Sequence, residues 1–457
     1  MVDVAAPASR TQGTFFGEPK ALAYLAFTEA WERFSYYGMT ALLVLYMTEA
    51  LFLPGHVEHI AGFAAFRAGI ESVFGKMSPV ALASQIYGLY TGFVYFTPVF
   101  GGIVADRWLG RRKAVVTGAI LMSGGHIAMA FDQSFLLALV LLITGCGLLK
   151  GNISTQVGQL YAEDDAPGRT RGYSIFSMGI NVGATVGPLA CGLLAQYFGW
   201  HAGFGLAGLL MLIGLATYLA GYRTLTEETP KANRGGTVAV KLGAREWRVI
   251  AALAVAMLLT VPQSVAYYQN TSIAFVWTDA HVNLDFFGFR IPTPWFGSID
   301  PFISIVFVPL LIALWGWQDR HGGEPDEVMK ISQGAFMAAA ANFLLVIGCW
   351  LFRPVPVIFP IVYDVILGIA FLYYWPPLLA LVSRAAPTGF KATLLGAAFL
   401  ALFVGNLLVG WVGTFYERMT PANFWALEGG IALVGGVLAF ALARPLMRIL
   451  AVPAKGR

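Results

Sequence analysis

The chain alternates long apolar segments with short polar ones along its whole length. A membrane-spanning helix needs about 20 consecutive apolar residues, and we count about twelve windows of this kind. They cover residues 21–53, 80–105, 113–131, 134–160, 172–198, 201–222, 247–278, 294–317, 328–352, 355–383, 391–416 and 422–450. The pattern predicts an all-α integral membrane protein with twelve transmembrane helices.

Composition excludes a soluble globular protein. Hydrophobic residues make up 58% of the chain and charged residues only 12%, whereas soluble domains carry about 25% charged residues. No positively charged segment, short apolar core and cleavage site precede the first span, so we expect no cleavable signal peptide. We therefore expect a multi-pass protein of the plasma or inner membrane.

Basic residues are distributed unequally between the two sides of the predicted membrane. If the N-terminus lies inside, most basic residues of the loops fall on the cytoplasmic side: Arg107, Arg111, Arg112, Lys113, Arg169, Arg171, Lys231, Arg234, Lys241, Arg245 and Arg248. The outer side receives Arg67, Lys76, Arg290, Arg353 and Arg418. Because cytoplasmic loops carry an excess of Lys and Arg, both termini are predicted to be cytoplasmic.

The longest inner polar segment divides the spans six and six. It covers residues 224–246 and is rich in Thr, Glu, Lys, Arg and Gly. We predict an N-terminal six-helix bundle (1–223), a cytoplasmic linker (224–246) and a C-terminal six-helix bundle (247–457). This is the arrangement of the major facilitator fold, whose substrate site lies at mid-membrane between repeats. Residues 57–74 and 279–292 are expected on the outer side.

The first span contains an unusual cluster of charges. Glu29, Glu32 and Arg33 occupy positions i, i+3 and i+4, and Tyr36 and Tyr37 follow one turn later, so one helix face carries all of them. At about 1.5 Å per residue, Glu32 lies about 17 Å into the span, near mid-bilayer. A charge there costs about 2.5–3.5 kcal/mol. This face must therefore meet other helices or a water-filled cavity.

Other polar residues interrupt neighbouring spans. Lys150 in the fourth span either extends to the membrane interface or attracts a carboxylate of the protein or of a substrate. Asn181 in the fifth span needs a partner, from another helix or from a ligand. The second span contains Tyr87, Tyr90 and Tyr95, which suit an organic-substrate pocket and equally a plain helix interface.

A glycine-rich and basic segment connects the second and third spans. It reads Gly-Gly-Ile-Val-Ala-Asp-Arg-Trp-Leu-Gly-Arg-Arg-Lys from Gly101 to Lys113. The spacing resembles the loop signature of major facilitator transporters. Either it is an ordinary positive-inside loop, or it acts in gating through a charged latch of Asp106, Arg107, Arg111 and Arg112.

Three runs together resemble the proton-dependent oligopeptide transporter (POT/PTR) family of the major facilitator superfamily. They are E-x-x-E-R-F-x-Y-Y-G from Glu29, G-x-G-x-x-K-x-N from Gly145, and F-S-x-x-I-N-x-G from Phe176. The resemblance covers the N-terminal half well. In the C-terminal half it rests on Ser298-Ile-Asp-Pro and Gly405-Asn406.

The resemblance implies proton-coupled symport of di- and tripeptides or related compounds by alternating access. In this family the two glutamates take part in proton coupling, together with the arginine that follows them. The arginine, the lysine of the fourth helix and the tyrosines face the substrate's carboxylate end. Transferred by matching position, the proton-coupling residues are Glu29, Glu32 and Arg33, and the substrate-binding residues are Arg33, Tyr36, Tyr37, Tyr95, Lys150 and Asn181.

The C-terminal half departs from the family pattern at three positions. An acid of the seventh helix is replaced by Tyr268, one of the tenth helix by Phe371, and a tryptophan of the eleventh by Ala398. Asp300 and Asp364 are the candidate replacements, because Asp364 lies two turns before Phe371 on nearly the same helix face. Either aspartate could bind a substrate ammonium or a proton, or be a hydrated residue at the outer mouth. The predicted substrate-binding set is completed by Asp300, Asp364 and Tyr268.

The remaining polar residues within spans are predicted to be structural. Cys146, Cys191 and Cys349 lack a metal-ligand spacing and are interpreted as packing residues. Glu428 in the last span is interpreted as structural and His126 in the third as a packing residue. The sequence shows no metal-spaced histidine cluster, nucleophile elbow or phosphate loop, so we predict a transporter, not an enzyme.

Two alternatives to peptide import stay open at this point. The same fold could carry a non-peptide organic anion or a modified peptide, in either direction, or it could be a non-transporting membrane sensor. The complete set of Glu29, Glu32, Arg33 and Lys150 argues against a sensor, which needs no proton coupling. We expect no cofactor apart from the proton gradient, no nucleic-acid partner, and function as a monomer in the lipid bilayer.

Overall fold

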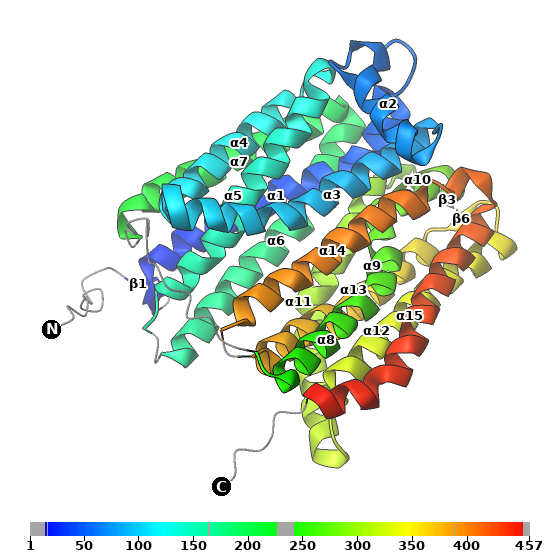
Figure 1. The fold of residues 1–457 in the computed structure, drawn as a ribbon. Helices are drawn as coiled ribbons and strands as arrows, with labels where there is room; N and C mark the ends of the chain where they lie inside the picture. The colour runs from blue at the N-terminus through cyan, green and yellow to red at the C-terminus, as the bar shows by residue number, and fades with distance from the viewer. Residues whose placement is uncertain (1–13, 16, 163–164, 226–241, 388, 451–457) are drawn as a thin grey trace, which may run out of the picture. The chain divides into compact units, whose positions relative to one another are not determined.

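Long α-helices make up nearly all of the structure, a computed structural model in which residues 14–15, 17–162, 165–225, 242–387 and 389–450 are described (Figure 1). Most of the predicted linker 224–246 lies outside these residues. The helices of the first half are α1 (Lys20–Tyr46), α2 (Phe63–Phe74), α3 (Pro79–Val104), α4 (Arg111–Ala128), α5 (Phe135–Gln159), α6 (Ala166–Phe198) and α7 (Trp200–Gly221). Those of the second half are α8 (Ala244–Leu259), α9 (Val261–Tyr268), α10 (Ile273–His281), α11 (Ile299–His321), α12 (Glu327–Leu351), α13 (Ile358–Ala385), α14 (Lys391–Gly413) and α15 (Pro421–Leu450).

Ten helical segments of the described chain are long and apolar enough to cross a membrane. The two other predicted spans are also helices, α1 and α4, with 27 and 18 residues. They are more polar because α1 carries the charged cluster around Glu32 and α4 begins with Arg111-Arg112-Lys113. The prediction of an all-helical membrane protein is confirmed.

The seventh span is broken, although the sequence predicts one continuous helix over 247–278. Helix α8 ends at Leu259, and Pro262 near the start of α9 lacks the N–H that would continue the backbone ladder. A three-ten turn, η6 (Gln269–Thr271), follows α9, and Ser272 has φ −118° and ψ −106° before α10 begins. The sequence gives no signal for this second break.

The described chain divides into two compact units. The first contains the described residues within Met1–Leu42, His59–Ala61 and Thr97–Arg234, and the second contains those within Leu43–Glu58, Gly62–Phe96 and Gly235–Arg457. Both α1 and α3 therefore contribute to each unit. In the second unit, buried side chains of α8, α12, α13 and α15 form a common core that includes Leu253, Ile331, Tyr374, Leu378 and Ala439. The predicted bundle boundaries at 223 and 247 stay a prediction.

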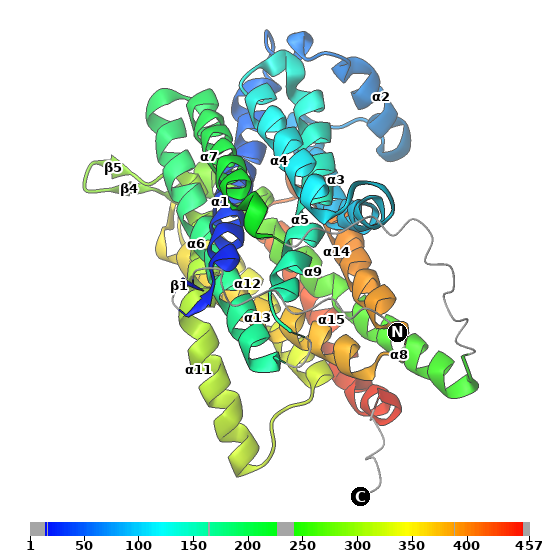
Figure 2. The same cartoon turned by 90° about the vertical axis from the view of Figure 1, so that its left-hand side faces the viewer.

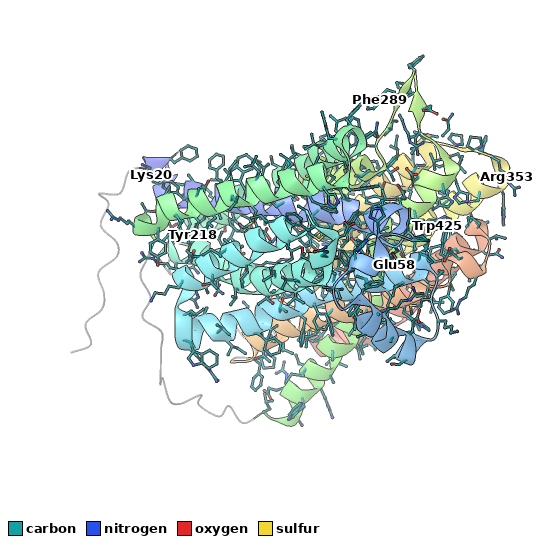
Figure 3. All side chains as sticks on the ribbon, turned by 90° about the horizontal axis from the view of Figure 1, so that it is seen from above. Lys20, Glu58, Tyr218, Phe289, Arg353 and Trp425 are labelled. Atoms are coloured by element: carbon teal, nitrogen blue, oxygen red, sulfur yellow. The ribbon has the colours of Figure 1, made fainter. Side chains whose placement is uncertain are left out.

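Short strands and turns lie between the helices. Strand β1 (Thr14–Phe15) pairs with β2 (Glu18–Pro19), and β3 (Val282–Asn283) runs parallel to β6 (Val355–Pro356). Strands β4 (Asp285–Phe286) and β5 (Phe289–Arg290) form a hairpin that projects from its unit (Figure 2). In the second unit, Arg353 and Trp425 lie toward the same end (Figure 3). Helix α2 forms within residues 57–74, the segment expected on the outer side.

In the first unit, a stripe of glycines on α6 lets α1 approach closely. Gly179, Gly183 and Gly187 are spaced by four residues and face one side of the helix. A Cβ at Gly183 would lie 2.2 Å from the carbonyl oxygen of Ala30, and one at Gly187 would lie 2.5 Å from that of Phe34. Small residues permit this approach in membrane helices. The stripe therefore fixes the part of α1 that carries Glu32 and Arg33.

We expect Gly183→Ala to destabilise the first unit by about 1–3 kcal/mol, because the added methyl group must push α1 away from α6. Thermal unfolding of the purified protein measures this loss. The matched control is Gly205→Ala on α7, where a Cβ would meet nothing within 4 Å. Equal unfolding temperatures for the two variants would refute the role of the stripe.

Candidate functional site

The structure brings together the three charged residues of α1. Arg33 Nε lies 3.0 Å from Glu29 Oε1 and also forms an ion pair with Glu32. Glu29, Glu32 and Arg33 are 2%, 0% and 3% exposed, so these charges are removed from solvent. The spacing i, i+3, i+4 thus places two carboxylates around one guanidinium, as the helix pattern predicts.

This cluster retains unused hydrogen-bonding capacity. Among the described residues, Arg33 Nη2, Glu29 Oε2 and Glu32 Oε1 have no hydrogen-bond partner. A buried donor without a partner costs about 1–3 kcal/mol, so the guanidinium fork can gain from an anionic ligand. The ring of Tyr36 lies 5.5 Å from the Arg33 guanidinium carbon, and Tyr37 packs edge-on against Tyr36 at 5.2 Å.

Lys150 on α5 is close to the same cluster. It interacts electrostatically with Glu29 and Glu32, which attract it, and with Arg33, which repels it. The structure therefore favours the second sequence interpretation of Lys150, attraction to carboxylates. Cys146, one turn earlier, is also within electrostatic range of Arg33 and Lys150. This cysteine therefore lies beside the charged cluster.

Close contacts of α5 with α3 and α4 determine where Lys150 lies. A Cβ at Gly147 would lie 2.7 Å from Thr97 Cβ, and one at Gly145 would lie 2.7 Å from the Gly118 oxygen. Asn152 donates hydrogen bonds to the carbonyls of Gly101 at 3.3 Å and Leu148 at 2.8 Å. The run around Lys150 therefore contains residues that attach α5 to its neighbours, a role for Asn152 that sequence reasoning missed.

Asn181 lies on α6 beside the glycine stripe. Its backbone carbonyl accepts a hydrogen bond from Thr185 at 2.8 Å, while its side chain forms no hydrogen bond with the described residues. It is half-buried. Of the two sequence hypotheses for Asn181, a helix partner and a ligand, the described residues supply no helix partner.

The tyrosines of α3 contact the broken seventh span within the second unit. The hydroxyl oxygens of Tyr95 and Tyr268 are 3.3 Å apart, and Tyr87 donates a hydrogen bond to Thr271 at 2.7 Å. These contacts match the alternative of a helix interface. They leave the rings of Tyr95 and Tyr268 packed at 6.0 Å with the polar tips paired.

Asp300 and Asp364 are neighbours in the second unit. Asp300 Oδ1 lies against Gly368 of α13, where a Cβ would approach it to 3.0 Å, and Gly368 is one turn after Asp364. The two aspartates interact electrostatically, and Asp364 is only 4% exposed. Tyr267 donates a hydrogen bond to Asp300 Oδ2, whereas Oδ1 has no hydrogen-bond partner among the described residues.

Phe371, at the position of the family's acid, is close to this pair. Its ring stacks on that of Tyr267 at 5.2 Å with an interplanar angle of 27°. Because Tyr267 also binds Asp300, the aspartate pair and Phe371 share one neighbour. No cationic side chain in the described parts of the chain interacts electrostatically with Asp300 or Asp364.

In the predicted gating loop, Arg111 forms an ion pair with Asp106 at 3.1 Å across a π-helical turn (Ala105–Leu109). The Arg112 guanidinium carbon lies 3.9 Å from the centre of the Tyr222 ring, and Arg107 is exposed. The ion pair is compatible with a latch, and the gating role stays a prediction. His126 is buried, and its two ring nitrogens have no hydrogen-bond partner among the described residues.

Comparisons with known proteins identify relatives over almost the whole chain. The family model described as PTR2, POT family, matches residues 112–250 and 240–426. An uncharacterized transporter, YclF of Bacillus subtilis (strain 168), is 29% identical, covering 93% of this chain and 94% of the relative. A di-/tripeptide transporter of Lactococcus lactis subsp. cremoris is 26% identical, covering 97% and 98%.

Solved structures agree with these sequence relatives. A crystal structure of the peptide transporter POT in complex with sulfate superposes with a TM-score of 0.82 at 27% identity, covering 96% of this chain and 97% of that one. A mutant of a peptide transporter POT in complex with alafosfalin gives a TM-score of 0.81 at 27% identity, with 97% and 98% covered. The chain therefore belongs to the POT family of multi-pass membrane transporters, and its fold is the major facilitator fold.

Proposed function

We propose that this protein imports di- and tripeptides or peptide-like compounds by proton-coupled alternating access. The observation that carries the proposal is the buried Arg33, which pairs with both Glu29 and Glu32 and has an unpartnered Nη2. Relatives described as di-/tripeptide transporters, and one structure with alafosfalin, support peptides as the substrate class.

Proton coupling follows from competition for the same guanidinium. While Glu29 and Glu32 are ionised, they occupy Arg33 and attract Lys150. Protonation of Glu32 removes one of these attractions, and Arg33 and Lys150 become able to bind a substrate carboxylate. At an effective dielectric constant of about 20, unit charges 4 Å apart interact by about 4 kcal/mol. One proton can therefore change substrate affinity by about three powers of ten.

Release reverses these steps on the cytoplasmic side. Once Glu32 loses its proton to the cytoplasm, its carboxylate pairs with Arg33 again and displaces the substrate carboxylate. Glu29, at 3.0 Å from Arg33 Nε, keeps one ion pair throughout. Tyr36, Tyr37 and Asn181 belong to the same unit and would supply aromatic surface and polar contacts to the substrate.

Asp300 and Asp364 are proposed to receive a cationic group of the substrate. Asp364 is buried and Asp300 half-buried, and without a cationic partner among the described residues they are unstable as a doubly charged pair. A substrate ammonium ion would offset one of the two negative charges. Tyr95 and Tyr268, in the same unit, complete the proposed substrate-binding residues. Carboxylates that receive an ammonium group favour a substrate with a free amine over purely anionic cargo.

A substrate panel tests this proposal. Uptake into liposomes under an inward proton gradient would be compared for dialanine, its N-acetyl form and its C-terminal amide. We expect dialanine to be preferred over both derivatives, each of which lacks one charged end. Equal or better uptake of the N-acetyl form would instead favour the organic-anion alternative.

Asp300→Asn and Asp364→Asn should each reduce the preference for dialanine over N-acetyl-dialanine by about tenfold or more, since an ion-paired hydrogen bond contributes about 1.5–3 kcal/mol. Competition uptake with both compounds measures this ratio. Asp285→Asn in the exposed β4–β5 hairpin is the matched control and should leave the ratio unchanged. An unaltered ratio of dialanine to N-acetyl-dialanine uptake in both Asp300→Asn and Asp364→Asn would exclude these aspartates as ammonium ligands.

A further inference from the structure

A third carboxylate site lies on α15, apart from the residues assigned to transport. Glu428 is 0% exposed. In the part of the chain that the structure describes, it interacts with the amide of Gln269 and with the Tyr363 hydroxyl, and with no cation. An ionised carboxylate buried without a cation is strongly disfavoured, so this side chain needs a ligand or a proton.

The hydrogen bonds of Gln269 show that the site lacks a hydrogen-bond donor. Its Nε2 donates one hydrogen bond to Glu428 Oε1 at 2.9 Å and another to the Val409 carbonyl of α14 at 3.1 Å. Both amide hydrogens are thereby used, and the orientation of the amide is fixed because both partners are acceptors. Glu428 Oε2 and Gln269 Oε1 remain, two buried acceptors without a donor among the described residues.

One proton supplies the missing donor for both atoms. A carboxylic acid and a primary amide can pair through two parallel hydrogen bonds, one in each direction. The bond from Gln269 Nε2 to Glu428 Oε1 is present, and a proton on Oε2 would donate the second to Gln269 Oε1. We propose that Glu428 is a proton-binding site whose occupied form pairs with Gln269 and fastens the break in the seventh span to α15.

The position of Gln269 gives this site a structural consequence. Gln269 is the first residue of η6, and Thr271 in the same turn accepts a hydrogen bond from Tyr87 of α3. Ser272, which follows, lies 3.5 Å from Ser84 of α3, hydroxyl to hydroxyl. Loss of the proton would leave two acceptors facing each other and loosen η6 from α15. The site thus links protonation of Glu428 to the part of the seventh span that contacts α3.

The described side chains and backbone groups around Glu428 are uncharged and cannot neutralise an ionised carboxylate. From α13 the facing titratable group is Tyr363. Helix α14 contributes the uncharged Val409 carbonyl, which accepts a hydrogen bond from Gln269, and α12 places the ring of Phe343 beside Gly429, the residue after Glu428. Helix α10 packs Trp277 against Trp425, one turn before Glu428, and α9 packs Pro262 against Gly435. These neighbours are uncharged, so the described residues supply no cation for Glu428, and a proton on the acid itself would neutralise it.

Infrared difference spectroscopy tests this directly. In the purified full-length protein at neutral pH without substrate, the spectrum of wild type minus Glu428→Gln should show the carbonyl band of one protonated carboxylic acid. Glutamine keeps both hydrogen bonds to Gln269, so the variant should fold. Glu71→Gln on α2 is the control, because Arg67 and the Met77 backbone lower the pKa of Glu71 and its difference spectrum should lack the band. Absence of the band for Glu428 would overturn the proposal.

A second variant covers the case in which Glu428→Gln does not fold. Gln269→Leu keeps Glu428 but removes its partner, so the acid band should persist and shift to higher frequency. An unshifted band would show that the proton is not shared with Gln269 and would also overturn the proposal. Neither measurement involves transport, so a failure here is distinguishable from a failure of the proposed peptide import.

Discussion

Glutamine in place of Glu32 should abolish substrate accumulation driven by a pH gradient while leaving substrate counterflow intact. Glutamine mimics the protonated acid, so Arg33 is permanently available for a substrate carboxylate. Because no proton leaves on the cytoplasmic side, the imposed gradient does no work on the substrate. Uptake and counterflow of a labelled dipeptide in the same proteoliposomes measure the two quantities.

The matched control is Glu58→Gln, at an exposed position between α1 and α2, which should accumulate substrate as wild type does. Wild-type accumulation by Glu32→Gln would refute the competition mechanism. If Glu32→Gln lost both counterflow and accumulation, Glu32 would have a role in folding or substrate binding instead of coupling.

Arg33→Lys should weaken binding of dialanine by roughly 10–100-fold and leave binding of its C-terminal amide nearly unchanged. The guanidinium offers two parallel donors to a carboxylate, and a lysine ammonium cannot reproduce that fork. Hydrogen bonds to charged groups contribute about 1.5–3 kcal/mol each, which sets the size of the loss. Calorimetric titration of the purified protein with both ligands measures it.

Lysine is preferred to alanine here because it retains a positive charge between Glu29 and Glu32. Removing one partner of a buried ion pair costs about 3–5 kcal/mol, so Arg33→Ala would confuse unfolding with weak binding. If Arg33→Lys bound dialanine and the amide with the wild-type affinity ratio, Arg33 would not be the carboxylate ligand.

The charged cluster of α1 could be predicted from sequence because its geometry is local. Helical spacing alone determines that Glu29, Glu32 and Arg33 share a face, and the apolar segment around them indicates burial. Ten of the twelve predicted spans also meet a criterion of length and hydrophobicity, whereas α1 and α4 are too polar to meet it.

Contacts between distant helices could not be predicted in this way. The proximity of Asp300 to Asp364 depends on Gly368, which lets α11 approach α13. The sequence suggested each aspartate separately, but gave no reason to pair them or to connect Tyr267 with Phe371. Such pairings are set by packing between helices that lie far apart in the sequence.

Glu428 illustrates the same limit more sharply. Its interpretation as a structural residue came from its place in the last span, which says nothing of Gln269, 159 residues earlier. The break at Ser272 has no proline or glycine to reveal it, so the buried amide of Gln269 in η6 could not be anticipated either. Only the folded chain shows two acceptors that one proton can satisfy.

Proton movement with the substrate is the most direct test of the central claim, that Glu29, Glu32 and Arg33 couple the two. Proteoliposomes would contain a pH-sensitive dye and start without a pH gradient, and dialanine would be added outside. We expect the lumen to acidify as the wild-type protein admits the dipeptide, and not to acidify with Glu32→Gln. Dipeptide entry through the wild-type protein without acidification of the lumen would contradict proton-coupled transport.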